Sequence, residues 1–377
     1  MLKNLASTEE MQDFFGTRPI ISSSIKLTRK CNLRCKHCYV DTDLKFKEMS
    51  ISQIKSTIDF LLKIGCMNLF FNGGEPFLRN DITEIFEYAF KKGISVSISS
   101  NGMLLNEQII KNISNFNPKL FQISIDGPKN IHNEIRRNNQ SFDKAIEALK
   151  FARKYFNNNT QIVMATTISM DNKDYILNML EIAKQLMVDT YCIVPLMPSS
   201  KKKFVSRDIS VGEKDKLIKK ISDVYIEQYK NFFEISIVVP PALVPKSIKK
   251  LKFGKGYLCT FPEMLGIDSN GIVAPCDGLL DDKKFNIGNI LKNDINEILN
   301  NKKFLEISNI NYNELVGVCS ICKYIRDCQG GCRVSSYNNY GNFYCPDSLC
   351  QAFYDANIFP DASIDRSKVY KNLKIGN

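Results

Sequence analysis

Strand-like and helix-like segments alternate over residues 21–211, and this alternation restricts the fold more than any other feature of the chain. Apolar strands separated by amphipathic helices are typical of a parallel sheet covered by helices. Six such units are too few to close a barrel, so they predict an α/β fold with an open, partial (β/α)6 barrel of the TIM type. The expected strands are 21–27, 67–71, 94–99, 120–125, 162–168 and 190–196, and the expected helices are 50–64, 81–92, 106–115, 141–156 and 172–187.

The alternation ends after about residue 211, and the rest of the chain has a different composition. A helical linker is expected over 212–254, and 255–377 reads as a small, loop-rich domain that holds eight of the thirteen cysteines. Within it, Asn270–Gly271 suits the tight turn of a hairpin. Residues 1–20 are then an N-terminal extension, and 21–211 form the partial barrel.

Charge and composition exclude several classes of protein. The net charge is +11, but the lysines are scattered and are not interleaved with aromatic residues, so nucleic acid is not the expected partner. No apolar run reaches the ~18–20 residues of a membrane span. The first residues lack a signal-peptide pattern, so a cytoplasmic protein is expected.

The cysteine count points to metal. Thirteen cysteines in a cytosolic chain of 377 residues do not suit a disulfide framework. Exposed clusters would need a reducing, oxygen-poor setting. Only two histidines occur, His37 and His132, which excludes metal sites rich in imidazole.

Three cysteines lie on one short loop after the first expected strand. Cys31, Cys35 and Cys38 have the spacing C-x3-C-x2-C. Three thiolates can hold three corners of a 4Fe–4S cube and leave the fourth iron open for a small ligand. A zinc loop with a distant fourth ligand and plain buried thiols are the alternatives, although zinc loops usually pair C-x2-C units.

This loop, together with the sequence GGEP at 73–76 after the second strand, resembles the radical S-adenosylmethionine (SAM) superfamily. The resemblance implies that Cys31, Cys35 and Cys38 hold a 4Fe–4S cluster whose open iron binds the amino and carboxylate groups of SAM. The reduced cluster then cleaves SAM to methionine and a 5′-deoxyadenosyl radical, which abstracts hydrogen from a substrate.

The same resemblance assigns SAM contacts to residues at the strand ends. Gly73, Gly74, Glu75 and Pro76 would meet the methionyl ammonium, because glycine permits close backbone approach and Glu75 supplies negative charge. His37 would pack near the adenine. Arg136 would meet the SAM carboxylate with its fork of donors, and a surface salt bridge is the alternative.

Four short polar residues complete the expected SAM site. Ser99 and Asn101 follow the third strand, where relatives contact the ribose, and Ser124 and Asp126 lie at the end of the fourth strand. Such residues at strand ends often only form caps and turns.

The C-terminal cysteines resemble the SPASM extension of radical SAM maturases, which holds two auxiliary 4Fe–4S clusters. Carried across, the first cluster would take Cys259, Cys276 and Cys332. Cys345 could replace Cys350 as a ligand, complete the first cluster or do neither. A zinc-ribbon-like structural site is the alternative to the two auxiliary clusters. The second cluster would take Cys319, Cys322, Cys328 and Cys350.

Asp277 follows Cys276 directly. Anaerobic sulfatase-maturing enzymes, a related SPASM group, have an aspartate there as a proton acceptor, which makes Asp277 a candidate catalytic residue. A loop aspartate or turn cap is the alternative.

These resemblances favour an oxidoreductase that matures a ribosomally made peptide. Its partner would be a peptide or protein substrate. A separate leader-recognition protein would present it, or the barrel and SPASM unit would bind it directly, because only about twenty residues precede the first strand. A flavodoxin- or ferredoxin-like protein would supply the electron.

Three alternatives stay open. Formylglycine formation is supported by Asp277, but Phe261 stands where that group has another cysteine ligand. Processing of tetrapyrrole or heme side chains suits a basic protein, although the SPASM cysteines are more complete than it needs. A non-catalytic iron–sulfur or zinc scaffold is opposed by the intact GGEP and Arg136.

Overall fold

A single continuous sheet organises the molecule. The computed structural model describes residues 20–42, 47–196, 207–249, 251, 259, 261 and 263–373. Within them, ten strands form one sheet in the order β10-β9-β8-β1-β2-β3-β4-β5-β6-β7. The strands are β1 (Ser22–Thr28), β2 (Asn68–Gly73), β3 (Ser95–Ser100), β4 (Leu120–Ser124), β5 (Gln161–Ile168), β6 (Thr190–Pro195), β7 (Glu234–Ile237), β8 (Met264–Ile267), β9 (Ile272–Ala274) and β10 (Gly288–Asn289).

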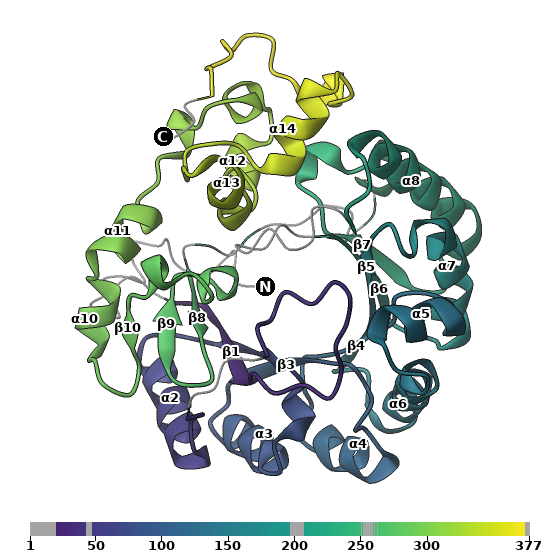
Figure 1. Cartoon of the computed structure of the whole chain (residues 1–377), viewed down its shortest axis with the longest axis vertical. Helices are drawn as coiled ribbons and strands as arrows, with labels where there is room; N and C mark the ends of the chain where they lie inside the picture. Colours follow the sequence, from purple (N-terminus) through teal and green to yellow (C-terminus); the bar gives the residue numbers. More distant parts are fainter. Residues whose placement is uncertain are drawn as a thin grey trace.

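Helices cover the outer face of the curved sheet, as Figure 1 shows. Strands β1 to β7 pair in parallel, which confirms the α/β partial barrel. None of the helices in the described ranges has both the length and the apolar character to cross a membrane. The covering helices are α2 (Ile51–Lys63), α3 (Ile82–Lys91), α4 (Glu107–Ser114), α5 (Lys129–Arg136), α6 (Ser141–Tyr155), α7 (Ile176–Gln185) and α8 (Val211–Val224).

Local signals explain why these helices form. Helix α2 begins at a capping box. The Ser50 side chain accepts from the Gln53 backbone N–H, and the Gln53 side chain accepts from the Ser50 backbone N–H. Its buried face carries Ile54, Ile58 and Leu61 at helical spacing. Helices α3, α4, α6 and α7 also bury mainly apolar side chains, whereas α5 buries His132, Asn133 and Arg136 beside Ile135.

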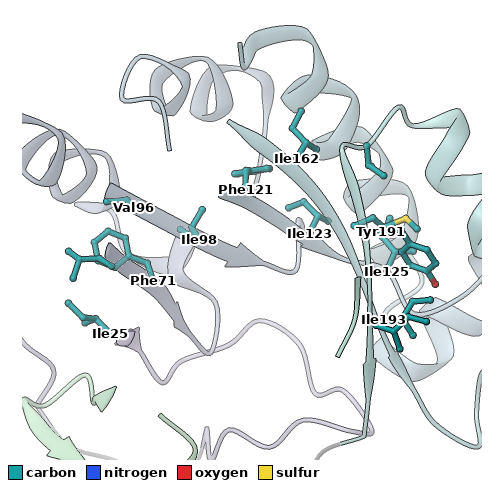
Figure 2. Packing of buried hydrophobic residues seen from close by; sticks show 14 of the residues in the cluster. Ile25, Phe71, Val96, Ile98, Phe121, Ile123, Ile125, Ile162, Tyr191 and Ile193 are labelled. Carbon is teal, nitrogen blue, oxygen red and sulfur yellow. The ribbon is translucent and has the colours of Figure 1, made fainter. Parts of the chain in front are cut away.

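The core lies between the sheet and these helices. Alternate residues along each strand point outward into this layer, and Phe71, Phe121 and Tyr191 are its largest members with no exposed surface. Figure 2 shows such side chains standing on successive strands from Ile25 to Ile193. The opposite faces of the strands line the interior of the arc and carry the polar residues.

The C-terminal part continues the sheet instead of forming a separate body. Strand β8 pairs in parallel with β1, and β8 and β9 form the hairpin expected around Asn270–Gly271. Strand β7 lies inside 212–254, which were expected to be a helical linker. The remaining helices, α9 (Lys246–Lys249), α10 (Ile295–Leu299), α11 (Lys302–Ser308), α12 (Ile325–Cys328), α13 (Arg333–Tyr340) and α14 (Ser348–Asp355), complete the C-terminal part, and α14 contacts α8.

Two glycines bring the ends of β1 and β2 together. The Gly74 N–H donates to the Thr28 carbonyl at 2.8 Å, and the Glu75 N–H donates to the Lys30 carbonyl at 2.8 Å. A Cβ on Gly73 would lie 2.1 Å from the Thr28 oxygen, and one on Gly74 would lie 2.0 Å from the Lys30 oxygen. The glycines therefore seat the GGEP turn on the backbone that leads into the cysteine loop.

We expect Gly74→Ala to lower the free energy of unfolding by about 3 kcal/mol, because the added methyl collides with backbone that cannot yield easily. Urea denaturation under anaerobic conditions measures this. Gly212→Ala is the matched control, because nothing lies within 4 Å of a Cβ at this position near the start of α8. Equal midpoints for the two variants would contradict the packing argument.

Candidate functional site

The three cysteines of the first loop lie together at the carboxyl end of β1. All three thiols are partly buried, and the Lys36 N–H donates to the Ile135 carbonyl at 2.9 Å, which fixes the loop against α5. Burial, followed by the charges of Cys35 and Cys31, raises the pKa of Cys38 to about 11. Mutually coupled thiols of this kind fit a shared metal cluster, which would hold them as thiolates.

Glu75 is fully buried beside this loop. Its carboxylate accepts from the Asn101 N–H at 2.8 Å, the Ser100 hydroxyl at 2.9 Å and the Phe77 N–H at 3.2 Å. Burial nevertheless raises the pKa of Glu75 to about 7. A buried carboxylate next to the cysteine loop suits a cationic ligand group, as expected for the SAM ammonium. Pro76 begins the short turn that follows.

Three further polar residues of the expected SAM site divide into two groups. The Asn101 side chain donates to Asn32 at 2.9 Å and lies 3.9 Å from the Cys31 sulfur, so it lies at the cysteine loop. Ser99 accepts from the Gln122 side chain at 3.1 Å inside the arc. Ser124 ends β4 on the same strand face as Gln122. Of these, Asn101 is the best placed for a ligand at the loop.

Asp126 and Arg136 form a buried ion pair. Arg136 Nε donates to Asp126 Oδ2 at 2.7 Å, and an Nη1 hydrogen points toward the Cys35 sulfur at 3.7 Å. Burial alone would raise the pKa of Asp126, but the charges of Arg136, His37 and His132 and the hydrogen bond from Arg136 together outweigh burial and lower the pKa to about 2. Asp126 therefore orients Arg136, and its own contact with SAM stays a prediction.

His37 completes this corner of the site. Its Nε2 lies 3.8 Å from Asp126 Oδ2, and burial lowers the pKa of His37 despite that neighbouring charge. A mostly neutral imidazole between Cys35 and Cys38 is compatible with packing against a planar ring.

The first predicted auxiliary set comes together from three distant segments. Burial raises the pKa of Cys276, and the charges of Cys259 and Cys332 raise it further. These three thiols therefore lie close enough to interact, although 73 residues separate Cys259 from Cys332. This is the grouping expected for the first auxiliary cluster.

The second predicted set also comes together. Burial, and then Asp347 and three cysteines, raises the pKa of Cys350 well above its ordinary value. Burial raises the pKa of the Cys345 thiol, and the charge of Arg333 acts in the opposite direction. The three cysteines that act on Cys350 are Cys319, Cys328 and Cys322.

A structural zinc ion and an iron–sulfur cluster require different arrangements of thiols. In the described residues, no three His, Cys, Asp or Glu side chains are placed to share a single metal ion. A structural zinc needs four ligands around one ion at about 2.3 Å. In a cubane each thiolate binds a different iron, so the sulfurs lie farther apart. The cluster assignments themselves stay predictions.

Asp277 faces the interior of the arc in a polar group that includes a lysine from β1. Lys26, which is 1% exposed, places Nζ 3.1 Å from Asp277 Oδ1. The Tyr39 hydroxyl lies 3.5 Å from Asp277 Oδ2, and the charge of Asp277 raises the pKa of Tyr39. The catalytic role of Asp277 stays a prediction, but its carboxylate is held in place between two donors.

Sequence reasoning missed the charged pairs that join β1 to the C-terminal part. Arg29 is buried and donates to both oxygens of Asp268 at 2.6 to 3.0 Å, and its Nη2 lies 2.6 Å from Asp281 Oδ1. The position of Lys26 could have been predicted, because a lysine between Ile25 and Leu27 on a buried strand must face the interior of the arc. Arg29 had no such local signal.

A cavity of about 730 Å³ lies inside the arc. Asn72 and Ser97 line it along the strands, while Tyr39, Cys276 and Cys332 belong to its wall near the two cysteine regions. Pockets of roughly 300 to 1,000 Å³ hold small organic ligands. The cavity therefore brings a substrate-sized space next to the first loop and the first auxiliary set.

Comparison with known families agrees with this site. The radical SAM superfamily matches residues 25–183, and SPASM, an iron–sulfur cluster-binding domain, matches residues 259–323. The chain therefore belongs to the radical SAM superfamily and carries a C-terminal SPASM domain. It is a radical SAM enzyme that uses SAM and iron–sulfur clusters.

Its relatives act on different substrates. The Fe-coproporphyrin III synthase of Methanosarcina barkeri is 25% identical over 351 residues, 86% of each protein. The AdoMet-dependent heme synthase of the same organism is 26% identical over 86% of this chain and 94% of that protein. A cysteine-type anaerobic sulfatase-maturating enzyme of Clostridium perfringens is 29% identical over 80% and 86%.

Solved structures share the fold. An anSMEcpe structure with bound AdoMet and the Cp18Cys peptide has a TM-score of 0.70 and 24% identity, covering 89% of this chain and 94% of that one. Streptococcus suis SuiB bound to its precursor peptide SuiA has a TM-score of 0.70 and 15% identity, covering 91% and 78%. These likenesses confirm the partial barrel with its C-terminal SPASM domain.

We expect Glu75→Gln to remove a pH dependence of stability. Since the folded pKa of Glu75 is raised to about 7, the folded protein binds the proton more tightly than the unfolded chain. The stabilisation that comes from protonated Glu75 is fully present in acid and is lost as the pH rises through about 7. Wild-type stability relative to Glu75→Gln should fall by about 3 kcal/mol between pH 4.5 and 7.5. Denaturation at both pH values checks this, and a constant difference would contradict it.

We expect Cys276→Ala and Cys350→Ala each to lose about four of about twelve irons, because each variant lacks a ligand of one auxiliary cluster. Cys345→Ala is the matched control at a buried thiol and should keep about twelve, since the spacing after Cys332 favours Cys350 as ligand. Iron and sulfide analysis of anaerobically reconstituted protein measures this. Four irons with bound zinc in the wild type would mean a structural staple instead.

Proposed function

We propose that this enzyme oxidises carboxylate side chains of an iron tetrapyrrole. Two relatives whose names specify Fe-coproporphyrin III and heme as products align over 86% of this chain, against 80% for the sulfatase-maturating enzyme. Sequence reasoning preferred a peptide substrate and kept the tetrapyrrole as an alternative. The relatives favour that alternative.

The observation that carries the proposal is the shared cavity. Cys276 and Cys332 of the first auxiliary set lie on its wall with Tyr39, which directly follows Cys38. A substrate in this space would lie between the site of hydrogen abstraction and an electron acceptor. Its volume of about 730 Å³ suits a compact organic molecule, and the net charge of +11 favours an anionic one.

The proposed reaction balances in atoms and electrons. The cofactors supply a 5′-deoxyadenosyl radical for hydrogen abstraction and an acceptor for one electron. A propionate side chain that loses a hydrogen atom, CO2 and one electron becomes a vinyl group. The protein residues hold the reactants: Glu75 and Arg136 would offer charges to the methionyl groups of SAM, and the cavity would hold the tetrapyrrole beside them.

Peptide oxidation is the second candidate. Asp277 favours it, because this residue lines the cavity beside Tyr39 and could accept a proton from a side chain under oxidation. Its carboxylate also pairs with Lys26. Homologues with the same fold bind peptide substrates. A flavodoxin- or ferredoxin-like protein is the proposed electron donor for either reaction.

We expect reconstituted enzyme, incubated anaerobically with SAM, dithionite and iron coproporphyrin III, to form 5′-deoxyadenosine faster than without the porphyrin. Mass spectrometry should show loss of CO2 and two hydrogens from each modified side chain. The Cys31→Ala variant is the control and should form neither product. An unchanged porphyrin, together with oxidation of a cysteine-containing sulfatase peptide, would replace this proposal by the second candidate.

A further inference from the structure

Arg333 is a buried cation at the junction of the two auxiliary cysteine sets. It is 3% exposed and begins α13 immediately after Cys332. Its Nη1 donates to the carbonyls of Phe343 at 2.5 Å and Cys345 at 2.8 Å, and its Nη2 donates to the Gly330 carbonyl. The Nε hydrogen has no partner and is buried. The guanidinium is thus held by neutral acceptors.

The described residues provide no ion pair for this charge. No carboxylate within them lies at salt-bridge distance from Arg333, although buried charges are normally paired. Asp347 is the nearby buried acid, and its carboxylate oxygens accept hydrogen bonds from the Cys332 and Leu349 backbone N–H groups at 2.9 Å. The start of a helix also disfavours a positive charge. The hydrogen bonds of Arg333 tie neighbouring chain segments together, but they leave its positive charge without a salt bridge.

Arg333 lies between cysteines of both auxiliary sets. It directly follows Cys332 of the first set. Its Nη2 donates to the carbonyl of Gly330, which is two residues after Cys328 of the second set. One buried cation is therefore placed between the ligand segments of both proposed clusters.

We propose that Arg333 is the shared internal counter-ion of the two auxiliary clusters and raises their reduction potentials. The inference rests on the cluster assignments of the proposed function. A cubane with thiolate ligands is anionic and gains a further negative charge on reduction, and cluster potentials respond to local charge and hydrogen bonding. A buried cation stabilises the reduced form most. Both auxiliary clusters would then accept an electron from the substrate more readily.

Gly330 and Gly331 make room for this arrangement. A Cβ on Gly330 would lie 2.6 Å from Arg333 Nη2, and one on Gly331 would lie 2.8 Å from the Asp347 Cβ. Both glycines have positive φ. The sequence GGCR at 330–333 therefore places a cysteine ligand and the counter-ion next to each other in one turn.

The test is a redox titration of the reconstituted holoenzyme, followed by electron paramagnetic resonance. For Arg333→Gln we expect the ratio of reduced to oxidised auxiliary cluster at a fixed potential to fall roughly tenfold, which is about 59 mV for one electron. The SAM-binding cluster should be unchanged. Arg333→Lys keeps the charge and should restore most of the shift. Arg326→Gln, an exposed arginine on α12, is the matched control and should leave all potentials unchanged.

Each outcome decides the inference. Unchanged auxiliary potentials in Arg333→Gln would overturn it. If Arg333→Gln loses the auxiliary irons, the Arg333→Lys variant decides. A Lys variant that binds the auxiliary clusters with wild-type potentials supports a role of the positive charge. A Lys variant that also loses these irons overturns the inference, because the shape of the arginine side chain would then be what the protein needs. Wild-type protein with about four irons and zinc would instead refute the proposed function, so the two failures are distinguishable.

Discussion

Strand β1 is hydrogen-bonded on both edges, and the rest of the molecule is arranged around that fact. On one side it pairs with β2, whose end carries the GGEP turn, and on the other with β8, which leads to the loop of Cys276 and Asp277. The cysteine loop leaves the carboxyl end of the same strand. One strand therefore sets the positions of the SAM site and of the first auxiliary set at once.

The side chains of β1 strengthen this arrangement by charge. Lys26 and Arg29 point to the C-terminal part and meet the carboxylates of Asp277, Asp268 and Asp281. Buried pairs of this kind contribute little net stability but fix the geometry, because removing one partner leaves an uncompensated charge. Figure 1 shows the result, with β8, β9 and β10 beside β1 and α12 to α14 across the open side of the arc.

The elements that sequence reasoning found are those defined by local signals. The six strands and the helices between them follow from short-range apolar periodicity, and capping at Ser50 marks the start of α2. Strand β7 was missed because four residues, Glu234–Ile237, give too little periodicity within a segment rich in proline. The pairing of β8 with β1 spans more than 200 residues, and no local pattern encodes it.

The candidate site shows the same division. The cysteine spacings and GGEP predicted which residues would gather, because those motifs are contiguous in sequence. Which partner each buried charge meets is a tertiary property, so the Arg136–Asp126 and Arg29–Asp268 pairs could not be foreseen. Arg333 stands directly after a predicted ligand, yet its burial without a carboxylate becomes visible only in the folded chain.

The parallel pairing of β8 with β1 also bears on how the protein can be handled. A truncated chain ending before β8 would expose the edge of β1, a strand whose residues are almost all buried in the whole protein. Open, apolar strand edges invite pairing with other chains. The barrel and the cysteine-rich part are therefore one folding and expression unit, in which the C-terminal part protects the barrel from aggregation.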